Sequence, residues 1–334
     1  MSEETSWKSK VQCALIAWYD ENKRPLPWRN NSNVYSVWLS EIILQQTRVE
    51  QGKPYWERML EVFPTLEDLA LAPEEEVFSI WSGLGFYRRA RNLHRTAQLL
   101  NGMDGWPMDA QSWEKLPGVG PYTAAAILSI CFNVRVPALD GNAYRVYSRL
   151  FGYSEPIDKR EAQSYFKRES LSILSENRPG DSNQAIMDLG SEICISSYPK
   201  CDRCPLSDYC KAYRQGNPHE YPVKTRKKPA TETVLSLFVH IHGTDVGLVK
   251  RTASGIWPEL WCFPENPIQG VSYELMHKKK HLLSHRKLSI RFYRARGFSK
   301  SSIPNDFQWF SIDDLKNVGV PVPVGELFKE IDYI

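Results

Sequence analysis

The chain has 334 residues, of which 42% are hydrophobic and 12% aromatic, enough to bury a core and to form about two domains. No apolar stretch approaches the roughly 18 residues that a membrane span requires, and the first residues lack the apolar core of a signal peptide. We therefore expect a globular, cytoplasmic protein without a membrane segment. The net charge of +3 allows a polyanionic partner but does not demand one, because DNA binding needs one basic face and not a large total charge.

Helical patterns dominate the chain up to about residue 210. Val11, Leu15 and Trp18 recur at helical spacing, and Pro25 and Pro27 then end that helix. Residues 34–44 form an apolar run that predicts a buried helix. Further helices are predicted over residues 66–80, 88–100, 109–116, 122–132, 142–150, 156–175 and 182–194.

The composition changes after residue 210. A polar, basic, proline-containing segment predicts an interdomain linker over residues 216–232, between a helical part (1–215) and a C-terminal part (233–334). Beyond it, residues 234–242 and 246–251 are β-like runs, and Leu288, Ile290 and Phe292 alternate with polar neighbours. The predicted fold is a mainly α part followed by a small α+β domain.

A glycine-containing turn separates two predicted helices at Leu116-Pro-Gly-Val-Gly120. Gly118 and Gly120 permit a tight hairpin whose free amides, at the start of the next helix, can hold a DNA phosphate. This spacing predicts a helix-hairpin-helix, and an ordinary turn between helices is the alternative.

A carboxylate follows the hairpin by twenty residues. Asp140 comes after the apolar residues 136–139 and shortly before Asn142. Either residue could simply cap the next helix. A carboxylate in this position would also face the DNA that the hairpin binds, which makes Asp140 a candidate functional residue.

Four of the seven cysteines lie within seventeen residues, at Cys194, Cys201, Cys204 and Cys210. A cytosolic protein is not expected to form disulfides, so this clustering indicates a metal or cluster site. Four thiolates can hold a [4Fe-4S] cluster or a zinc ion. The other three cysteines are scattered and are expected to be inert.

Several segments together resemble one family. Residues 26–29 (LPWR), 37–48 (VWLSEIILQQTR) and 81–94 (WSGLGFYRRARNLH), with 116–127 and 136–146, resemble the adenine DNA glycosylase (MutY) family of the helix-hairpin-helix DNA glycosylase superfamily. The resemblance covers most of residues 20–215. It implies a six-helix module and an iron-sulfur module, and a monofunctional enzyme of base excision repair. The implied partner is duplex DNA with adenine opposite 8-oxoguanine or guanine, bound by a monomer.

The resemblance assigns the catalytic residues. Glu41 interrupts an apolar helical run, where burial raises a carboxyl pKa, and would protonate the departing adenine. Asp140 would stay ionised and stabilise the positive sugar. Tyr122 stands where strand-cleaving relatives carry a Schiff-base lysine, so we expect base removal without efficient strand cleavage. A solvent-facing helix glutamate is the alternative for Glu41.

The resemblance also implies the DNA contacts and the cofactor. The family usually inserts a tyrosine into the base stack where this chain has Phe86, which keeps the ring but lacks the hydroxyl. The four clustered cysteines match the family's spacing for a [4Fe-4S] cluster. The residues expected to contact the DNA or the extruded base are Arg29, Leu44, Gln46, Thr47, Phe86, Gly118, Gly120, Asn142, Gln184 and Ser284.

The C-terminal part resembles, more weakly, the Nudix-like 8-oxoguanine recognition module of the same family. Residues 257–264 and 307–315 carry this likeness, and 283–285 align with a lesion-reading loop in which Leu283 replaces a phenylalanine. The glutamate-rich helix of true Nudix hydrolases is missing, so pyrophosphatase activity is not expected. Basic residues near the loop would bind phosphate or form a solvated face: Lys278, Lys279, Lys280, Arg286 and Lys287.

Three other functions remain open. An endonuclease III-like glycosylase/lyase is disfavoured by Tyr122 and by the C-terminal part, and a thymine:guanine glycosylase by Glu41. In a non-catalytic DNA-binding protein, Glu41 and Asp140 would be merely structural.

Overall fold

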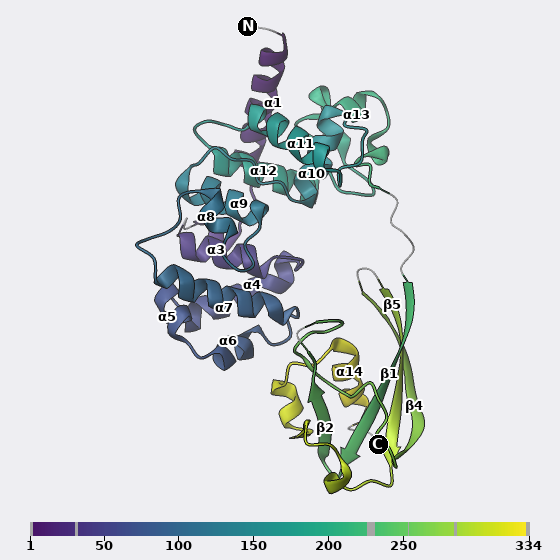
Figure 1. The fold of residues 1–334 in the computed structure, drawn as a ribbon. Coiled ribbons are helices and arrows are strands. Elements are labelled where there is room, and N and C mark those ends of the chain that lie inside the picture. Colours follow the sequence, from purple (N-terminus) through teal and green to yellow (C-terminus); the bar gives the residue numbers. More distant parts are fainter. Residues whose placement is uncertain (1–2, 31–32, 226–230, 253, 284–285, 332–334) are drawn as a thin grey trace. The chain divides into compact units, whose positions relative to one another are not determined.

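The computed structural model describes residues 3–30, 33–225, 231–252, 254–283 and 286–331. The chain divides into two compact units, Met1–Arg226 and Lys227–Ile334, and the division falls within the segment predicted as a linker (Figure 1). Ser284, predicted to read the lesion, lies outside the described residues.

The first unit is helical, and no strand occurs among its described residues. Its helices are α1 (Glu3–Asn22), α2 (Pro27–Asn30), α3 (Val34–Ile43), α4 (Val49–Val62), α5 (Leu66–Leu71), α6 (Glu74–Trp81), α7 (Tyr87–Asn101), α8 (Ala110–Glu114), α9 (Pro121–Phe132), α10 (Gly141–Phe151), α11 (Arg160–Ile173), α12 (Pro179–Glu192) and α13 (Lys211–Arg214). Short 3₁₀ turns are η1 (Cys201–Arg203), η2 (Ser207–Tyr209) and η3 (Pro218–Glu220). The mainly α prediction is confirmed for this unit.

The observed helices differ from the predicted ones in three segments of the first unit. The predicted helix 66–80 is two helices, α5 and α6, because Pro73 cannot donate to the turn before it and holds Ala72 in an extended conformation (ψ 148). Helix α4 was not predicted, since Pro54 lies inside it. Residues 156–175 form a helix only from Arg160 onward.

Two apolar cores hold the first unit together. Trp38, Leu39, Trp81 and Trp113 belong to the core built from α3 to α9. A second core joins α1 to α10, α11 and α12, and includes Leu15, Tyr147, Phe166 and Leu189. Helix α9 packs against both α3 and α12 and so links the two groups of helices (Figure 1).

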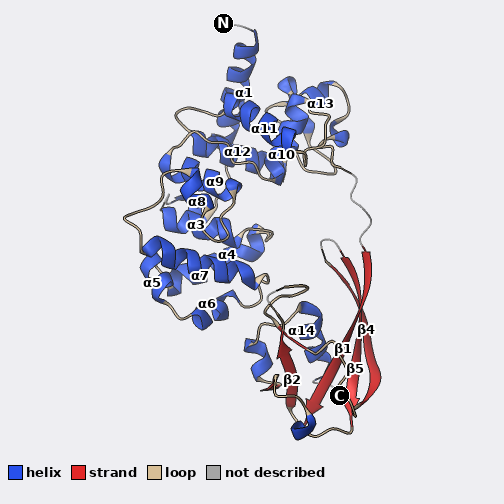
Figure 2. Cartoon of the chain, viewed as in Figure 1, coloured by secondary structure: helices blue, strands red, loops and turns tan. Residues whose placement is uncertain are grey.

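The second unit is a twisted sheet with a helix on one face, as Figure 2 shows. Its elements are β1 (Thr231–His242), β2 (Asp245–Lys250), β3 (Trp261–Cys262), β4 (Ser272–Leu282), β5 (Arg286–Arg296), β6 (Phe307–Ser311), α14 (Val322–Ile331) and the turns η4 (Lys300–Ser302) and η5 (Asp314–Asn317). The strand order is β3-β2-β1-β5-β4, with β6 paired to β2. Strands β1 and β5 are parallel, and the other pairs are antiparallel. The α+β prediction is confirmed.

Alternate residues of β1 and β5 form the core of this unit. Leu237, Val239, Ile290 and Phe292 are fully buried and pack in one cluster with Leu327 of α14. Among the described residues of the whole chain, no helix is both long enough and apolar enough to cross a membrane.

Candidate active site

Helix α3 carries Glu41 among buried neighbours. Asn33 caps the helix by accepting a hydrogen bond from the Tyr35 amide at 2.9 Å. The Glu41 side chain keeps part of its surface accessible, yet the protein packed around its carboxyl raises its pKa to about 7, mainly by burial. A hydrogen bond from Tyr122 and the charge of Arg29 oppose this rise in pKa, and Asp140 adds to it. The carboxyl can therefore carry a proton at neutral pH.

Tyr122 stands in the first turn of α9, directly after the hairpin. Its hydroxyl is hydrogen-bonded to Glu41 and lies 3.6 Å from the sulfur of Met187. Burial, together with the Glu41 and Asp140 carboxylates, raises the pKa of Tyr122 well above its ordinary value. The residue is therefore a neutral phenol that donates to Glu41.

Asp140 caps helix α10. Its carboxylate accepts from the Ala143 amide at 2.7 Å and from the Asn142 side-chain amide at 2.9 Å. Burial raises the pKa of Asp140, and these two donors oppose the rise. Asp140 therefore caps a helix and also lies close to the other two catalytic candidates, because its charge raises the pKa of both Glu41 and Tyr122.

Arg29 forms a two-pronged ion pair with Asp188 of α12. Its two terminal nitrogens lie 2.6 and 3.0 Å from the two carboxylate oxygens, and Asp188 is 1% exposed. The guanidinium also lies over the ring of Tyr19 at 5.8 Å. The sequence predicts Arg29 near the base but does not predict its partner Asp188. A carboxylate one turn after Gln184 on an apolar helix is the signal that was available.

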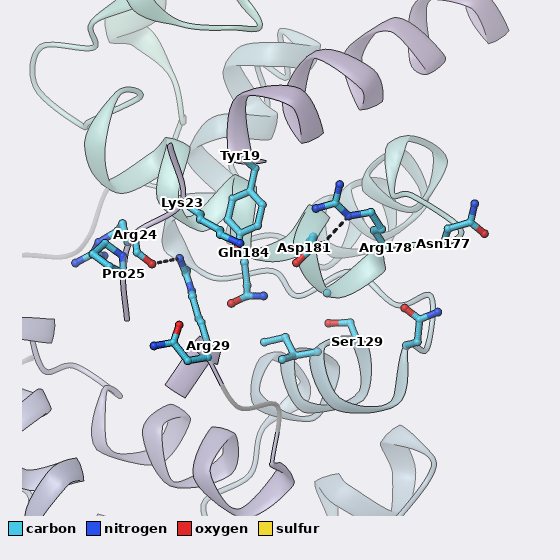
Figure 3. Close-up of a pocket in the computed structure, with 14 residues that line it drawn as sticks. Tyr19, Lys23, Arg24, Pro25, Arg29, Ser129, Asn177, Arg178, Asp181 and Gln184 are labelled. Carbon is cyan, nitrogen blue, oxygen red and sulfur yellow. Dashed lines mark hydrogen bonds and ion pairs between the residues drawn. The ribbon is translucent and has the colours of Figure 1, made fainter. Parts of the chain in front are cut away.

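A polar cavity of about 370 Å³ lies where α1, α2, α9 and α12 meet (Figure 3). Its lining includes Tyr19, Arg29, Ser129, Arg178 and Gln184, and no catalytic candidate is among the described residues that line it. Gln184 is 8% exposed, and Figure 3 shows its amide pointing into the cavity. Arg29 lines this cavity and also acts electrostatically on Glu41.

The neighbouring Asn183 has a structural role. Its side chain accepts from the Ala138 amide at 3.0 Å and donates to Ser129 Oγ and to the Val136 carbonyl, each at 2.9 Å. These bonds hold the segment that leads into Asp140 against helix α12. Asn142 in turn accepts from Arg145 at 2.8 Å.

The predicted hairpin joins α8 to α9. Gly118 has a φ of +79, a left-handed conformation that glycine adopts without strain, and a Cβ there would lie 3.0 Å from Asn92 Cβ. The Gly118 carbonyl accepts from Gln45 at 3.1 Å. Gly120 is extended and caps α9, which begins with Pro121. The turn is thus the compact hairpin that the sequence predicts.

Two exposed side chains stand on left-handed backbone near this hairpin. Gln46 has a φ of 58 and Phe86 a φ of 53, and Phe86 is 63% exposed. Leu44, at the end of α3, is partly buried against the core. An exposed aromatic side chain on left-handed backbone is not explained by packing, and such strained positions cluster at functional sites.

Arg89, which is not among the predicted site residues, connects these two turns. Its Nη1 donates to the Ile43 carbonyl at 2.8 Å, to Thr47 Oγ1 at 3.0 Å and to the Gln45 carbonyl. The same guanidinium lies 5.3 Å from the Phe86 ring centroid and 5.4 Å from that of Trp81. One half-buried cation therefore holds the segment that contains Gln46 beside the turn that contains Phe86.

The four clustered cysteines line one small cavity and are free thiols. Arg149 donates to Cys194 Sγ at 3.2 Å, and Arg145 donates to the Cys194 carbonyl at 2.8 Å. Within the described ranges, no three Cys, His, Asp or Glu side chains are grouped as a site for a single metal ion. The sulfurs surround a space next to two cationic side chains.

Comparison with known proteins places both units. Residues 39–170 match the HhH-GPD superfamily of base excision DNA repair proteins, and residues 236–330 match the NUDIX domain. An adenine DNA glycosylase of Buchnera aphidicola subsp. Acyrthosiphon pisum is 32% identical over 338 residues, covering 94% of this chain and 95% of the relative. The adenine DNA glycosylase of Arabidopsis thaliana is 38% identical over 297 residues, covering 76% of this chain but only 47% of the plant protein. A thermostable thymine-DNA glycosylase shares the fold, with a TM-score of 0.59 at 24% identity, covering 64% of this chain and 100% of that one.

Proposed function

This chain belongs to the adenine DNA glycosylase family, and we propose that it removes adenine paired with 8-oxoguanine or guanine by base flipping and acid catalysis. It is a DNA glycosylase of base excision repair, and DNA is its partner. The finer assignments below concern the mispair, the catalytic residues and the cofactor.

The observation that carries the mechanism is the environment of Glu41. A carboxyl with a pKa of about 7 is partly protonated at neutral pH, whereas an exposed glutamate is almost fully ionised. Adenine is a poor leaving group as an anion, so its departure requires a proton donor. Tyr122, hydrogen-bonded to Glu41, orients that donor.

Glu41 is proposed to act first as an acid toward the adenine and then as a base toward water. Its proton moves to N7 of the extruded adenine while the bond between the sugar C1′ and the base N9 breaks, and the bonding electrons leave with the now neutral base. The sugar becomes oxocarbenium-like, as in glycoside hydrolysis. Water then bonds to C1′ and gives its proton to the Glu41 carboxylate, which restores the acid.

Asp140 is proposed to stabilise the positive sugar as a carboxylate. It accepts two hydrogen bonds, from Ala143 and Asn142, and such donors favour the ionised form. Tyr122 occupies the position of the lyase lysine and offers no amine, so no Schiff base forms with the sugar. The product is then an intact strand with an abasic site.

Arg29 and Gln184 are proposed to contact the extruded base. Both line the polar cavity, and the Gln184 amide has no hydrogen-bond partner among the described residues, although it is 8% exposed. An amide that faces a polar cavity can donate and accept hydrogen bonds at the edge of a base that enters the cavity. Arg29 can also hold its charge near Glu41, because Asp188 fixes the guanidinium.

The remaining proposed DNA contacts lie on turns of the first unit. Phe86 would fill the gap left by the extruded base, since its ring is exposed and inserted side chains commonly occupy such gaps. Leu44, Gln46 and Thr47 would approach the mispair from the neighbouring turn. Gly118 and Gly120 would bring the hairpin amides to a phosphate.

A [4Fe-4S] cluster is proposed at the four cysteines. The thiols surround one cavity, and Arg145 and Arg149 place positive charge beside it, which suits a cluster with four thiolate ligands. A bound cluster would cross-link residues 194–210. A zinc ion held by the same thiolates is the alternative.

The second unit is proposed to recognise 8-oxoguanine. Its match to the NUDIX domain supports a module that binds a nucleotide-like group. The predicted lesion-reading loop connects β4 to β5, and Leu283 at its start is partly buried.

A nicking assay tests the function. A labelled duplex with adenine opposite 8-oxoguanine is incubated with enzyme and then divided, one half receiving alkali. We expect strand cleavage only after alkali. Cleavage without alkali that borohydride traps as a protein-DNA adduct would favour an endonuclease III-like lyase. Absence of product on this mispair and on adenine opposite guanine would favour a non-catalytic DNA-binding protein.

A further inference from the structure

One face of the sheet in the second unit carries no helix among its described residues. On the other face, Leu237, Ile290 and Phe292 pack with α14. Side chains alternate along a strand, so the residues between these point to the opposite side. There, Val234 is 56% exposed, Leu275 43% and Leu282 70%. At the far end of β1, His240 on this same side is fully buried against Phe298 and Phe307. We therefore call only the uncovered part, residues 234–238 of β1, 287–293 of β5 and 275–282 of β4, the open face.

Four cations lie on the open face. Lys278 pairs across the strands with Arg291, and Lys280 with Ser289, while Lys287 follows at the loop end of β5. Lys278 and Lys280 are two residues apart, so their side chains leave the same face about 7 Å from each other. All four cationic side chains are exposed.

The open-face cations differ from their neighbour Lys279. Lys279 points to the helix-covered face and forms an ion pair with Glu326 of α14 at 2.5 Å. By contrast, no ion pair of Lys278, Lys280, Lys287 or Arg291 occurs within the described part of the chain. The strand alternation thus divides the predicted basic run into a structural lysine and a set of exposed cations without an ion pair. An exposed carboxylate, Glu232 of β1, lies opposite Lys287 on the same side.

An aromatic pair continues the open face beyond the cations. Phe238 of β1 and Tyr293 of β5 are cross-strand partners with ring centroids 5.4 Å apart and planes 19° from parallel. Both rings are partly exposed. Exposed cations beside partly exposed rings are a composition by which proteins bind nucleic acid, because the cations replace counterions on the phosphates.

We propose that the open face binds the phosphate backbone of duplex DNA. The inference deepens the proposed function and rests on it for the choice of duplex, since a mispair exists only there. The cations begin next to the loop that connects β4 to β5 and extend away from it along both strands. A duplex that reaches this loop would meet Lys280 and Lys287 first, then Lys278 and Arg291.

The test is the salt dependence of binding by the full chain to a fluorescent, undamaged duplex. Removing one cation that touches a phosphate lowers the slope of log affinity against log salt by about 1. We expect Lys278→Gln with Lys280→Gln to lower it by about 2, and Arg291→Gln by about 1. Lys250→Gln, which removes an exposed cation on β2, is the charge-matched control for Arg291→Gln and should leave the slope unchanged.

Two further measurements keep the outcome decisive. Lys278→Arg with Lys280→Arg keeps the charge and should keep the slope, and thermal unfolding of each variant shows that it is folded. Equal slopes for the glutamine variants and for Lys250→Gln would overturn the proposal. The binding test uses an undamaged duplex and so does not depend on catalysis. If the unaltered protein failed to release adenine, the proposed function would be refuted, but the salt slopes would still decide whether the open face binds DNA.

Discussion

Arg29 and Asp188 lie 159 positions apart in the sequence and form a paired, nearly buried contact in which two nitrogens meet two carboxylate oxygens at 2.6 and 3.0 Å. This ion pair joins α2 to α12, and its Arg29 both lines the polar cavity and acts electrostatically on Glu41, the proposed acid. It therefore affects both the stability of the first unit and the charge near the acid.

The first prediction concerns that ion pair. Asp188→Asn leaves the Arg29 charge largely buried and without its partner, which should lower the free energy of unfolding by about 3 kcal/mol or more. Urea denaturation measures the change. Asp20→Asn is the matched control, because Asp20 also accepts from two nitrogens of one arginine, Arg178, but at the surface, where such pairs contribute little. Equal losses in the two variants would contradict this account.

The second prediction is the pH dependence of base removal. As the proposed acid, Glu41 would have to be protonated to act, and its pKa is about 7. The single-turnover rate should therefore be constant well below pH 7 and fall about tenfold for each pH unit well above it. Glu41→Gln should abolish excision while the protein still binds the mispair duplex. A rate that rises through pH 7 would exclude this carboxyl as the acid.

The third prediction uses stability instead of activity to test the same residue. Burial raises the pKa of Glu41 from 4.5 to about 7, so its favourable contribution is complete below pH 4.5 and is lost as the pH rises through 7. Glu41→Gln removes the ionisation. Relative to the unaltered protein, it should gain about 3 kcal/mol between pH 4.5 and pH 8. Denaturation at the two pH values measures this, and a pH-independent difference would mean that the carboxyl is not buried in solution.

The fourth prediction concerns Arg89 as a positioning residue. Arg89→Lys cannot reach the Ile43 and Gln45 carbonyls and Thr47 together, so the two left-handed turns should lose their relative placement. We expect single-turnover excision to fall up to about 100-fold, with little change in thermal unfolding. Arg95→Lys on the exposed side of α7 is the control. If Arg89→Lys weakened only overall DNA affinity and left the saturated rate intact, the positioning role would be wrong.

The fifth prediction separates the two glycines of the hairpin. Gly118→Ala places a Cβ on a left-handed residue 3.0 Å from Asn92 and should cost about 1 kcal/mol or more in stability. Gly120→Ala meets nothing within 4 Å and should be nearly neutral in the same denaturation experiment. A neutral Gly118→Ala would show that the turn can relax.

The cysteine site is tested by its metal content. Anaerobically purified protein should contain about four iron atoms per chain and absorb visible light, and Cys204→Ser should lose both. Cys13→Ser, an exposed cysteine outside the group, should lose neither. One zinc ion per chain with no iron would favour the alternative.

Local spacing determined a large part of this protein from its sequence alone. The helical first unit, the glycine hairpin, the carboxyl of Glu41 inside an apolar helix and the alternation of Leu288, Ile290 and Phe292 could all be predicted, because each depends on residues close together in the chain. Helix α4 was not predicted, since Pro54 indicates a break that its neighbours in the fold override.

Tertiary structure alone decided which distant groups meet. Asp188 pairs with Arg29, and Arg89 reaches the carbonyls of residues 43 and 45, only because α2, α3, α7 and α12 pack as they do. Lys278 lies on the open face while Lys279 pairs with Glu326, and this difference depends on the strand register, which shifts at a bulge between Leu275 and His277. Such partners follow from burying apolar faces against one another, and the free energy of that packing is shared by the whole unit, so no short stretch of sequence specifies it.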